Sequence, residues 1–165
     1  MSFNFSILVE YAPLFLRGAL NTLLITAAAS VIGVILGLLL ALARLSGLRL
    51  LSWPAYVFIE FFRTTPPLIQ IIWAYFVIPV LIGYEITSFQ AASLALGLNT
   101  AAFLAEIFRS AILGVDPAQR DASTVLGLSP YAAYRHVILP QALRLAIPPA
   151  TTNLMFLVKS TSLAA

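Results

Sequence analysis

The chain has 165 residues, of which 61% are hydrophobic and only 9% are charged. Soluble domains carry about 25% charged residues, so this composition excludes an ordinary soluble protein and predicts one embedded in lipid. The chain has no cysteine and one histidine, His136, which excludes a disulfide scaffold and leaves almost no material for a metal site or a nucleophilic catalytic centre. The nine basic residues are scattered singly, without the basic stripe typical of nucleic-acid binding. We therefore expect no metal, cofactor or nucleic acid.

Apolar runs predict an all-α fold, a polytopic bundle with about four membrane spans. Residues 18–43 carry no charge, and as a helix they would extend roughly 39 Å, more than a hydrocarbon core about 30 Å thick. The other spans are expected at residues 64–84, entered through the apolar segment 53–62; at residues 86–105, continuing to 113; and at residues 145–158. Pro66 and Pro67 predict that the second span is one long span with a break.

Basic residues indicate which loops face the cytoplasm. Arg44 and Arg49 follow the first span, and four further arginines lie between the third and fourth spans. Residues 83–88, between the second and third spans, contain no basic residue. The positive-inside rule therefore predicts that both arginine-bearing loops are cytoplasmic, and that the N-terminus and residues 83–88 are outside.

The loop at residues 114–140 has the densest start and stop signals. Asp116, with Gln119 three residues later, predicts a capping box at a helix start, and Gly127 suits the left-handed residue that ends such a helix. Ser129 repeats the start signal, so we expect two short helices joined at a glycine. The first is shaped to lie in the groove of a partner protein. From spacing alone, a helical hairpin resting on the membrane surface fits equally well.

The same loop resembles the signature of inner-membrane permease subunits of ATP-binding-cassette importers. That signature is Glu-Ala-Ala, three residues, Gly, nine residues, Ile, any residue, Leu-Pro. The corresponding residues here are Asp121-Ala122-Ser123, Gly127, Val137 and Leu139-Pro140, with every separation kept. More narrowly, the chain resembles the polar amino acid branch, which serves histidine, glutamine, glutamate, arginine or opines, in the segments EFFRTTP (60–66), LNTAAFLAEIFR (98–109), VILPQA (137–142) and KSTSL (159–163).

This resemblance implies one transmembrane permease domain, residues 1–165, in a bacterial inner membrane, with residues 114–140 as the loop that couples to an ATPase. Two permease subunits, identical or homologous, would form the pathway, a dimer of cytoplasmic ATPases would drive it, and a periplasmic or lipid-anchored binding protein would deliver the amino acid. The chain has no Walker A sequence, so ATP hydrolysis is expected in the ATPase partner. Members usually have a fifth span after the last motif, so we expect the C-terminal part of the domain to be missing.

Polar residues at membrane depth are candidates for the substrate pathway, because such residues are costly in lipid. They are Arg63, Thr64, Gln70, Asn99, Glu106 and Asn153. The first three flank the proline break, where free N–H groups of the restarting helix are expected to favour the substrate carboxylate. Asn99 and Glu106, seven residues apart on one helical face, are expected to receive its ammonium group. Contacts to the ATPase are expected from Gln119, Arg120, Asp121, Ala122, Ser123 and Gly127.

Structural roles remain open for some of these residues. Glu60 can pair with Arg63 along one helix, and Glu106 can pair in the same way with Arg109. A different function is an ion-coupled secondary transporter in which Glu60 and Glu106 carry protons, although it gives the stiff loop no role. A nonfunctional truncated permease is a further alternative.

Overall fold

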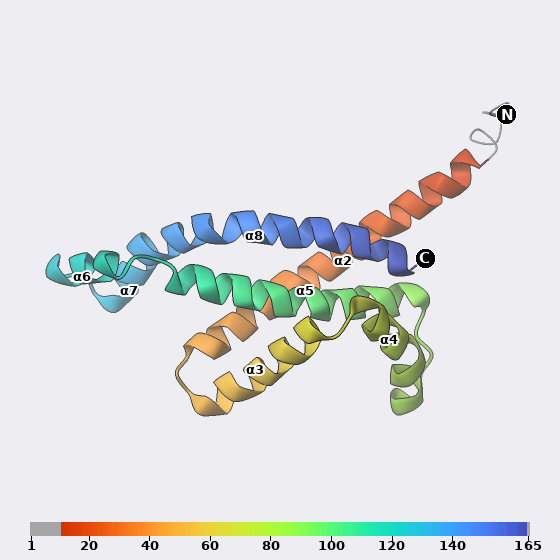
Figure 1. Cartoon of the computed structure of the whole chain (residues 1–165), viewed down its shortest axis with the longest axis horizontal. Coiled ribbons are helices and arrows are strands. Elements are labelled where there is room, and N and C mark those ends of the chain that lie inside the picture. The colour runs from red at the N-terminus through yellow and green to blue at the C-terminus, as the bar shows by residue number, and fades with distance from the viewer. Residues whose placement is uncertain (1–10, 165) are drawn as a thin grey trace.

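The computed structural model describes residues 11–164, which form helices joined by short connections, without a strand among them (Figure 1). The elements are α2 (Ala12–Leu45), α3 (Arg49–Thr64), α4 (Pro67–Ile82), α5 (Ser88–Leu113), α6 (Pro117–Val125), α7 (Pro130–Ala133), the π-helical segment η1 (Tyr134–Ile138), α8 (Leu139–Ser160) and the 3₁₀ turn η2 (Thr161–Ala164). The predicted all-α fold is confirmed. The N-terminus, for which the sequence predicts an outside location, lies outside the described residues.

Helix α5 is the centre of the bundle, and α8 runs alongside it while α2 crosses it (Figure 1). A Cβ added at Gly33 would meet Thr100, and one added at Gly37 would meet Leu104, so α2 and α5 run in the same direction. Leu157 packs with Leu96 and Ala142 with Ile112, so α8 runs in the opposite direction to α5. The chain therefore passes back and forth through the bundle, as successive membrane crossings require.

Small residues allow α2 and α5 to approach closely. The buried face of α2 has Ala29, Gly33, Gly37 and Ala41 at four-residue intervals. A Cβ added at Gly33 would lie only 2.6 Å from Thr100 Cγ2. Because lipid tails are as apolar as leucine, helices in membranes associate through such close backbone packing rather than through a hydrophobic driving force.

The second predicted span is not one continuous helix. Helices α2 and α5 are each long and apolar enough to cross a membrane, whereas α3 and α4 meet that test only as a pair bent by 107°. Thr65, which precedes a proline, adopts an extended conformation with φ −87° and ψ 130°. The predicted break is confirmed, because two successive prolines redirect the chain, and the two helices together are long and apolar enough for one broken span.

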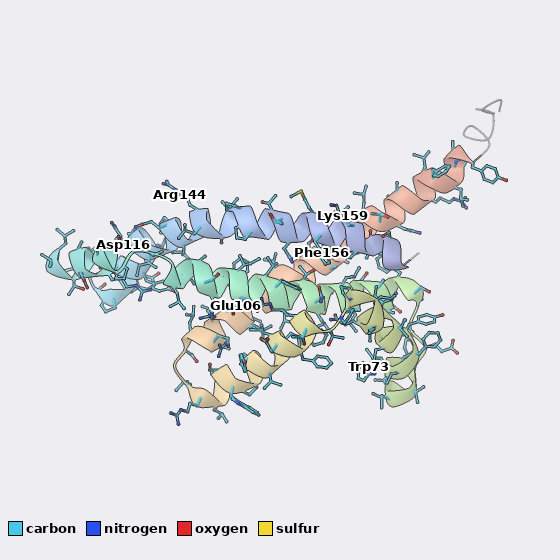
Figure 2. The ribbon with its side chains drawn as sticks, viewed as in Figure 1. Trp73, Glu106, Asp116, Arg144, Phe156 and Lys159 are labelled. Carbon is cyan, nitrogen blue, oxygen red and sulfur yellow. The ribbon has the colours of Figure 1, made fainter. Side chains whose placement is uncertain are left out.

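Helix α8 begins before the fourth predicted span. It starts at Leu139, and its 22 residues extend about 33 Å at 1.5 Å per residue, but α8 is not among the described helices that are both long and apolar enough to cross a membrane. Pro148 and Pro149 lie inside it without ending it. Many large apolar side chains, including the labelled Trp73 and Phe156, are exposed in the described structure (Figure 2). This surface suits lipid or another membrane subunit.

Candidate functional site

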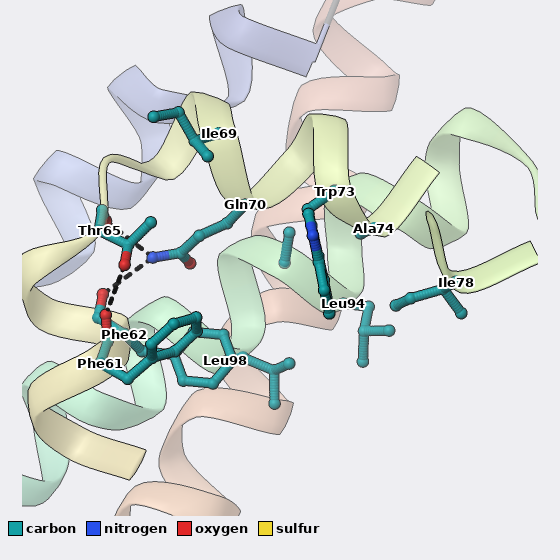
Figure 3. A pocket seen from close by; sticks show the side chains of 11 residues that line it. Phe61, Phe62, Thr65, Ile69, Gln70, Trp73, Ala74, Ile78, Leu94 and Leu98 are labelled. Atoms are coloured by element: carbon teal, nitrogen blue, oxygen red, sulfur yellow. Dashed lines mark hydrogen bonds between the residues drawn. The ribbon is translucent and has the colours of Figure 1, made fainter. Parts of the chain in front are cut away.

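The bend between α3 and α4 forms a crease that two amide side chains hold together, of which Figure 3 shows that of Gln70. The Nε2 of Gln70 donates hydrogen bonds to the carbonyl oxygens of Phe62 at 2.9 Å and Thr65 at 2.8 Å. From α5, Asn99 Nδ2 donates to the same Phe62 oxygen at 2.8 Å. The last carbonyls of a helix have no partners within that helix, so these amides supply them and attach the crease to α5.

The start of α4 offers few of the free N–H groups that we expected there. Pro66 and Pro67 have no N–H, and the N–H groups of Ile69 and Gln70 both donate to the Pro66 carbonyl, at 3.1 and 3.3 Å. That expectation is wrong for these four residues, because the extended residue before the helix presents its own carbonyl to them. A carboxylate at the crease must therefore find its donors mainly among side chains.

A cavity of about 300 Å³ lies in the crease between α3, α4 and α5 (Figure 3). Its lining residues are Phe61, Phe62, Thr65, Ile69, Gln70, Trp73, Ala74, Ile78, Leu94, Ala95 and Leu98. Gln70 is only 6% exposed, and its Oε1 has no hydrogen-bond partner within the protein. The hydroxyl of Thr64 donates to the Glu60 carbonyl of its own helix at 2.8 Å, so Thr64 contributes a local bond rather than a crease contact.

Glu106, in the C-terminal half of α5, lies beside basic side chains. The Arg109 guanidinium forms an ion pair with Glu106 and donates two hydrogen bonds to its carboxylate. One of them joins Nε to Oε2 at 3.0 Å. The Arg63 guanidinium carbon lies 5.4 Å from the centre of the Phe103 ring, a cation–π arrangement. Two guanidinium groups and one carboxylate make this region of α3 and α5 net positive.

The two structural pairings that the sequence left open have different outcomes. Glu106 pairs with Arg109, and this is the only ion pair in the part of the chain that the structure describes. Glu60 therefore does not pair with Arg63, which lies over Phe103 instead.

Asn153 lies on α8, apart from the hydrogen bonds of the crease. It is half-buried, and its Oδ1 has no hydrogen-bond partner within the protein. The hydroxyls of Thr26 on α2 and Ser93 on α5 are buried without partners in the same way. The sequence analysis did not include Thr26 and Ser93 among the pathway candidates. The one feature of the sequence that could have indicated them is a hydroxyl side chain within an apolar run.

The loop helix α6 has the predicted start and end. The Oδ1 of Asp116 accepts from the Ala118 N–H at 2.9 Å, and Gly127 adopts a φ of +72° just after the helix. The predicted capping box is wrong, because Gln119 does not close it and instead accepts from Gln141 Nε2 of α8 at 3.3 Å. A helix after Ser129 is confirmed, although α7 continues through η1 into α8 rather than standing alone.

A capping box does form elsewhere, at the start of α5. The Thr87 hydroxyl accepts from the Gln90 N–H at 3.3 Å, and the Gln90 side chain accepts from the Thr87 N–H at 2.9 Å. The Thr-x-x-Gln spacing was the signal in the sequence that could have identified it.

The two faces of α6 have different surroundings. Arg120 donates through Nη2 to the Ile112 carbonyl at the end of α5, at 3.2 Å, and Ser123 is only 4% exposed. On the other side, Val125 and Leu126 are 87% and 77% exposed. Asp121 and Ala122 are also exposed. Arg120 and Ser123 therefore face the bundle. Val125 and Leu126 face outward, although the sequence analysis did not include them among the expected ATPase contacts.

Long apolar helices, a polar crease beside a positively charged region and a stiff, outward-facing loop helix define a membrane permease that works with a partner protein. The family described as binding-protein-dependent transport system inner membrane component matches residues 11–165. The chain therefore belongs to this family of importer permease subunits.

Named relatives match nearly the whole chain. It is 42% identical over 163 residues to the probable amino-acid ABC transporter permease protein YckA of Bacillus subtilis, covering 99% of this chain and 72% of that protein. It is 37% identical over 164 residues to the glutamine transport system permease protein GlnP of Escherichia coli, covering 99% of this chain and 75% of the relative.

Solved structures confirm the fold. A crystal structure of an amino acid ABC transporter with histidines matches with a TM-score of 0.91 and 35% identity, covering 99% of this chain and 76% of the other. An inward-facing MetNI methionine ABC transporter matches with a TM-score of 0.70 and 29% identity, over 92% of this chain and 73% of that one.

Proposed function

We propose that this permease imports a polar amino acid, delivered by an extracytoplasmic binding protein and driven by ATP hydrolysis in a partner. The observation that carries the substrate class is the Glu106–Arg109 pair on α5, with the Arg63 guanidinium lying over Phe103 of the same helix. Every amino acid carries a carboxylate, and a guanidinium fork binds carboxylates in a directional manner. The names of the relatives, which include glutamine and amino-acid permeases, support the same class.

The pathway is proposed to use the six polar residues predicted from the sequence. The contacts that each side chain makes in the structure suggest its role. Arg63 binds the substrate carboxylate, and Glu106 exchanges Arg109 for the substrate ammonium group. Gln70 and Asn99, which both donate to Phe62, hold the crease in shape. The remaining two, Thr64 and Asn153, line the route on α3 and α8.

Glu106→Gln is expected to weaken amino acid uptake at least tenfold, because a charge-assisted hydrogen bond contributes about 1.5–3 kcal/mol and 1.4 kcal/mol corresponds to tenfold. The measurement is uptake of labelled amino acid by cells or vesicles that carry the assembled transporter. Glu60→Gln is the matched control, since Glu60 is an exposed carboxylate of α3 without an ion pair in the described structure. If uptake falls only as much as assembly does in both Glu106→Gln and Arg109→Gln, the pair is a structural contact and the substrate role is contradicted.

The partners are proposed from the loop and from the family. The exposed face of α6, with Val125 and Leu126, docks on a dimer of cytoplasmic ATPases, which hydrolyse the ATP. A stiff helix fixed to the ends of α5 and α8 can transmit a rigid-body closure of those ATPases. A second permease subunit, identical or homologous, completes the pathway. The domain spans the chain, with residues 114–140 as its coupling loop.

The proposed orientation in the inner membrane places the N-terminus and residues 83–88 outside and the coupling loop in the cytoplasm. In the cysteine-free chain, Ser88→Cys is expected to react with a membrane-impermeant thiol reagent in intact cells. Ser129→Cys is expected to react only after the cells are permeabilised. Both serines are exposed, so access across the membrane decides the result. If Ser129→Cys alone is labelled in intact cells, the proposed orientation is wrong.

A further inference from the structure

A second charged cavity lies at the turn between α2 and α3, at the end of the bundle where α2 finishes. It has a volume of about 420 Å³ and is lined by Arg44, Arg49, Ser52, Trp53 and Tyr56. The lining contains two arginines and no acidic residue. This combination is unusual for a chain in which only 9% of the residues are charged.

The side chain of Arg44 is held in place at one wall of this cavity. Its Nη1 donates to the Ser52 hydroxyl at 3.1 Å, and its guanidinium carbon lies 4.9 Å from the centre of the Tyr56 ring. Its Nε is buried and has no hydrogen-bond partner within the protein. Neither Arg44 nor Arg49 forms an ion pair with any described residue, and the carboxylate of Glu106 is held by Arg109. The cavity therefore concentrates two guanidinium groups, neither of which is held in a salt bridge by a described residue.

The position along α2 places the cavity at the surface of the membrane. The uncharged run of residues 18–43 ends immediately before Arg44. Trp53 is 70% exposed beside the cavity, and Tyr56 is exposed on the same helix. Tryptophan and tyrosine are enriched at the level of lipid headgroups, because their rings are amphipathic. A ligand here would have its charged part among the arginines and an apolar part along the helices.

We propose that this cavity binds the phosphate group of an anionic phospholipid. Two guanidinium groups and the Ser52 hydroxyl offer donors that suit phosphate oxygens. An anionic lipid is favoured over a zwitterionic one because the lining has no carboxylate to receive a choline or ethanolamine ammonium group. A lipid is favoured over free phosphate because the largely exposed apolar ring of Trp53 lines the site. Basic pockets at the ends of membrane helices bind lipid headgroups by this chemistry.

The test measures lipid binding to the purified, delipidated full chain in detergent by native mass spectrometry. Phosphatidylglycerol is expected to bind tightly and phosphatidylcholine weakly. In the double variant Arg44→Gln/Arg49→Gln, phosphatidylglycerol affinity is expected to fall roughly 20- to 30-fold, because each basic residue at a membrane surface contributes about 1 kcal/mol and 1.4 kcal/mol corresponds to tenfold. Arg44→Lys/Arg49→Lys, which keeps both charges, is expected to retain the preference for phosphatidylglycerol over phosphatidylcholine and thereby separates charge from folding.

The matched control is Arg17→Gln/Arg144→Gln, which removes the same total charge from two exposed positions outside the cavity. An equal loss of phosphatidylglycerol affinity in this control would overturn the proposal, since binding would then follow net charge alone. Equal binding of phosphatidylglycerol and phosphatidylcholine to the native chain would also overturn it. Competition by millimolar inorganic phosphate would assign the site to a soluble anion and overturn the choice of a lipid.

Discussion

Gly127→Val is expected to abolish substrate-stimulated ATP hydrolysis by the assembled transporter while the permease still inserts in the membrane. Gly127 has a φ of +72°, a conformation that a β-branched residue adopts only with a strain of about 1–3 kcal/mol. A Cβ added there would meet nothing within 4 Å, so the strain comes from the backbone and not from crowding.

The same glycine closes the end of α6. Its N–H donates to the Thr124 carbonyl at 3.0 Å, and the next N–H, from Leu128, donates to the Ser123 carbonyl at 3.1 Å. These two bonds form a Schellman motif, which requires a left-handed residue at this position. Relief of the strain would open the motif and turn Val125 and Leu126 away from the docking direction that we propose.

Two variants separate the docking role from strain in general. Gly127→Asn is expected to keep most of the stimulated ATPase activity, because asparagine tolerates the left-handed conformation. Gly83→Val introduces the same strain at a φ of +69° in the turn after α4, and it is expected to leave coupling intact. ATP hydrolysis is measured in proteoliposomes that contain the permease, the ATPase and the binding protein. If Gly127→Val keeps full substrate-stimulated ATP hydrolysis, the coupling role is contradicted and the loop is better explained as a hairpin that rests on the membrane surface.

Gly37→Leu is expected to destabilise the bundle by about 3 kcal/mol, the upper end of the range for overpacking. A Cβ at Gly37 would lie 3.0 Å from the Ala101 carbonyl oxygen and 3.0 Å from Leu104 Cβ. Neither neighbour can rotate away, because one atom is backbone and the other is fixed to it. The larger side chain must therefore push α2 away from α5, the helix on which the bundle is built.

The measurement is the free energy of unfolding of the purified chain in mixed micelles. Gly18→Leu is the control, because a Cβ at Gly18 meets nothing within 4 Å. Gly33→Ala should have a smaller effect than Gly37→Leu, because it adds a single carbon whose shortest contact, at 2.6 Å, is with Thr100 Cγ2, an atom that a rotamer change can move. An unfolding free energy of Gly37→Leu equal to that of the native chain would show that α2 and α5 do not pack through this seam.

The sequence by itself determined the features that depend on residues close together in the chain. The uncharged run of residues 18–43 is enough to predict α2, because the bilayer sets the length of a span. Asp116 and Gly127 marked the ends of α6, since caps and left-handed turns use hydrogen bonds within a few residues. The loop motif and its spacing also pointed to the family.

The tertiary structure decided which partner each polar group takes. Asn99 lies 37 residues from Phe62 in sequence yet donates to its carbonyl, and Glu106 takes Arg109 while Arg63 lies over an aromatic ring. The inward direction of Arg120 was likewise set by a carbonyl at the end of α5. These choices depend on which donors and acceptors the packed helices bring within reach of one another. A local pattern holds no information about that competition, because its outcome depends on the angles at which distant helices cross.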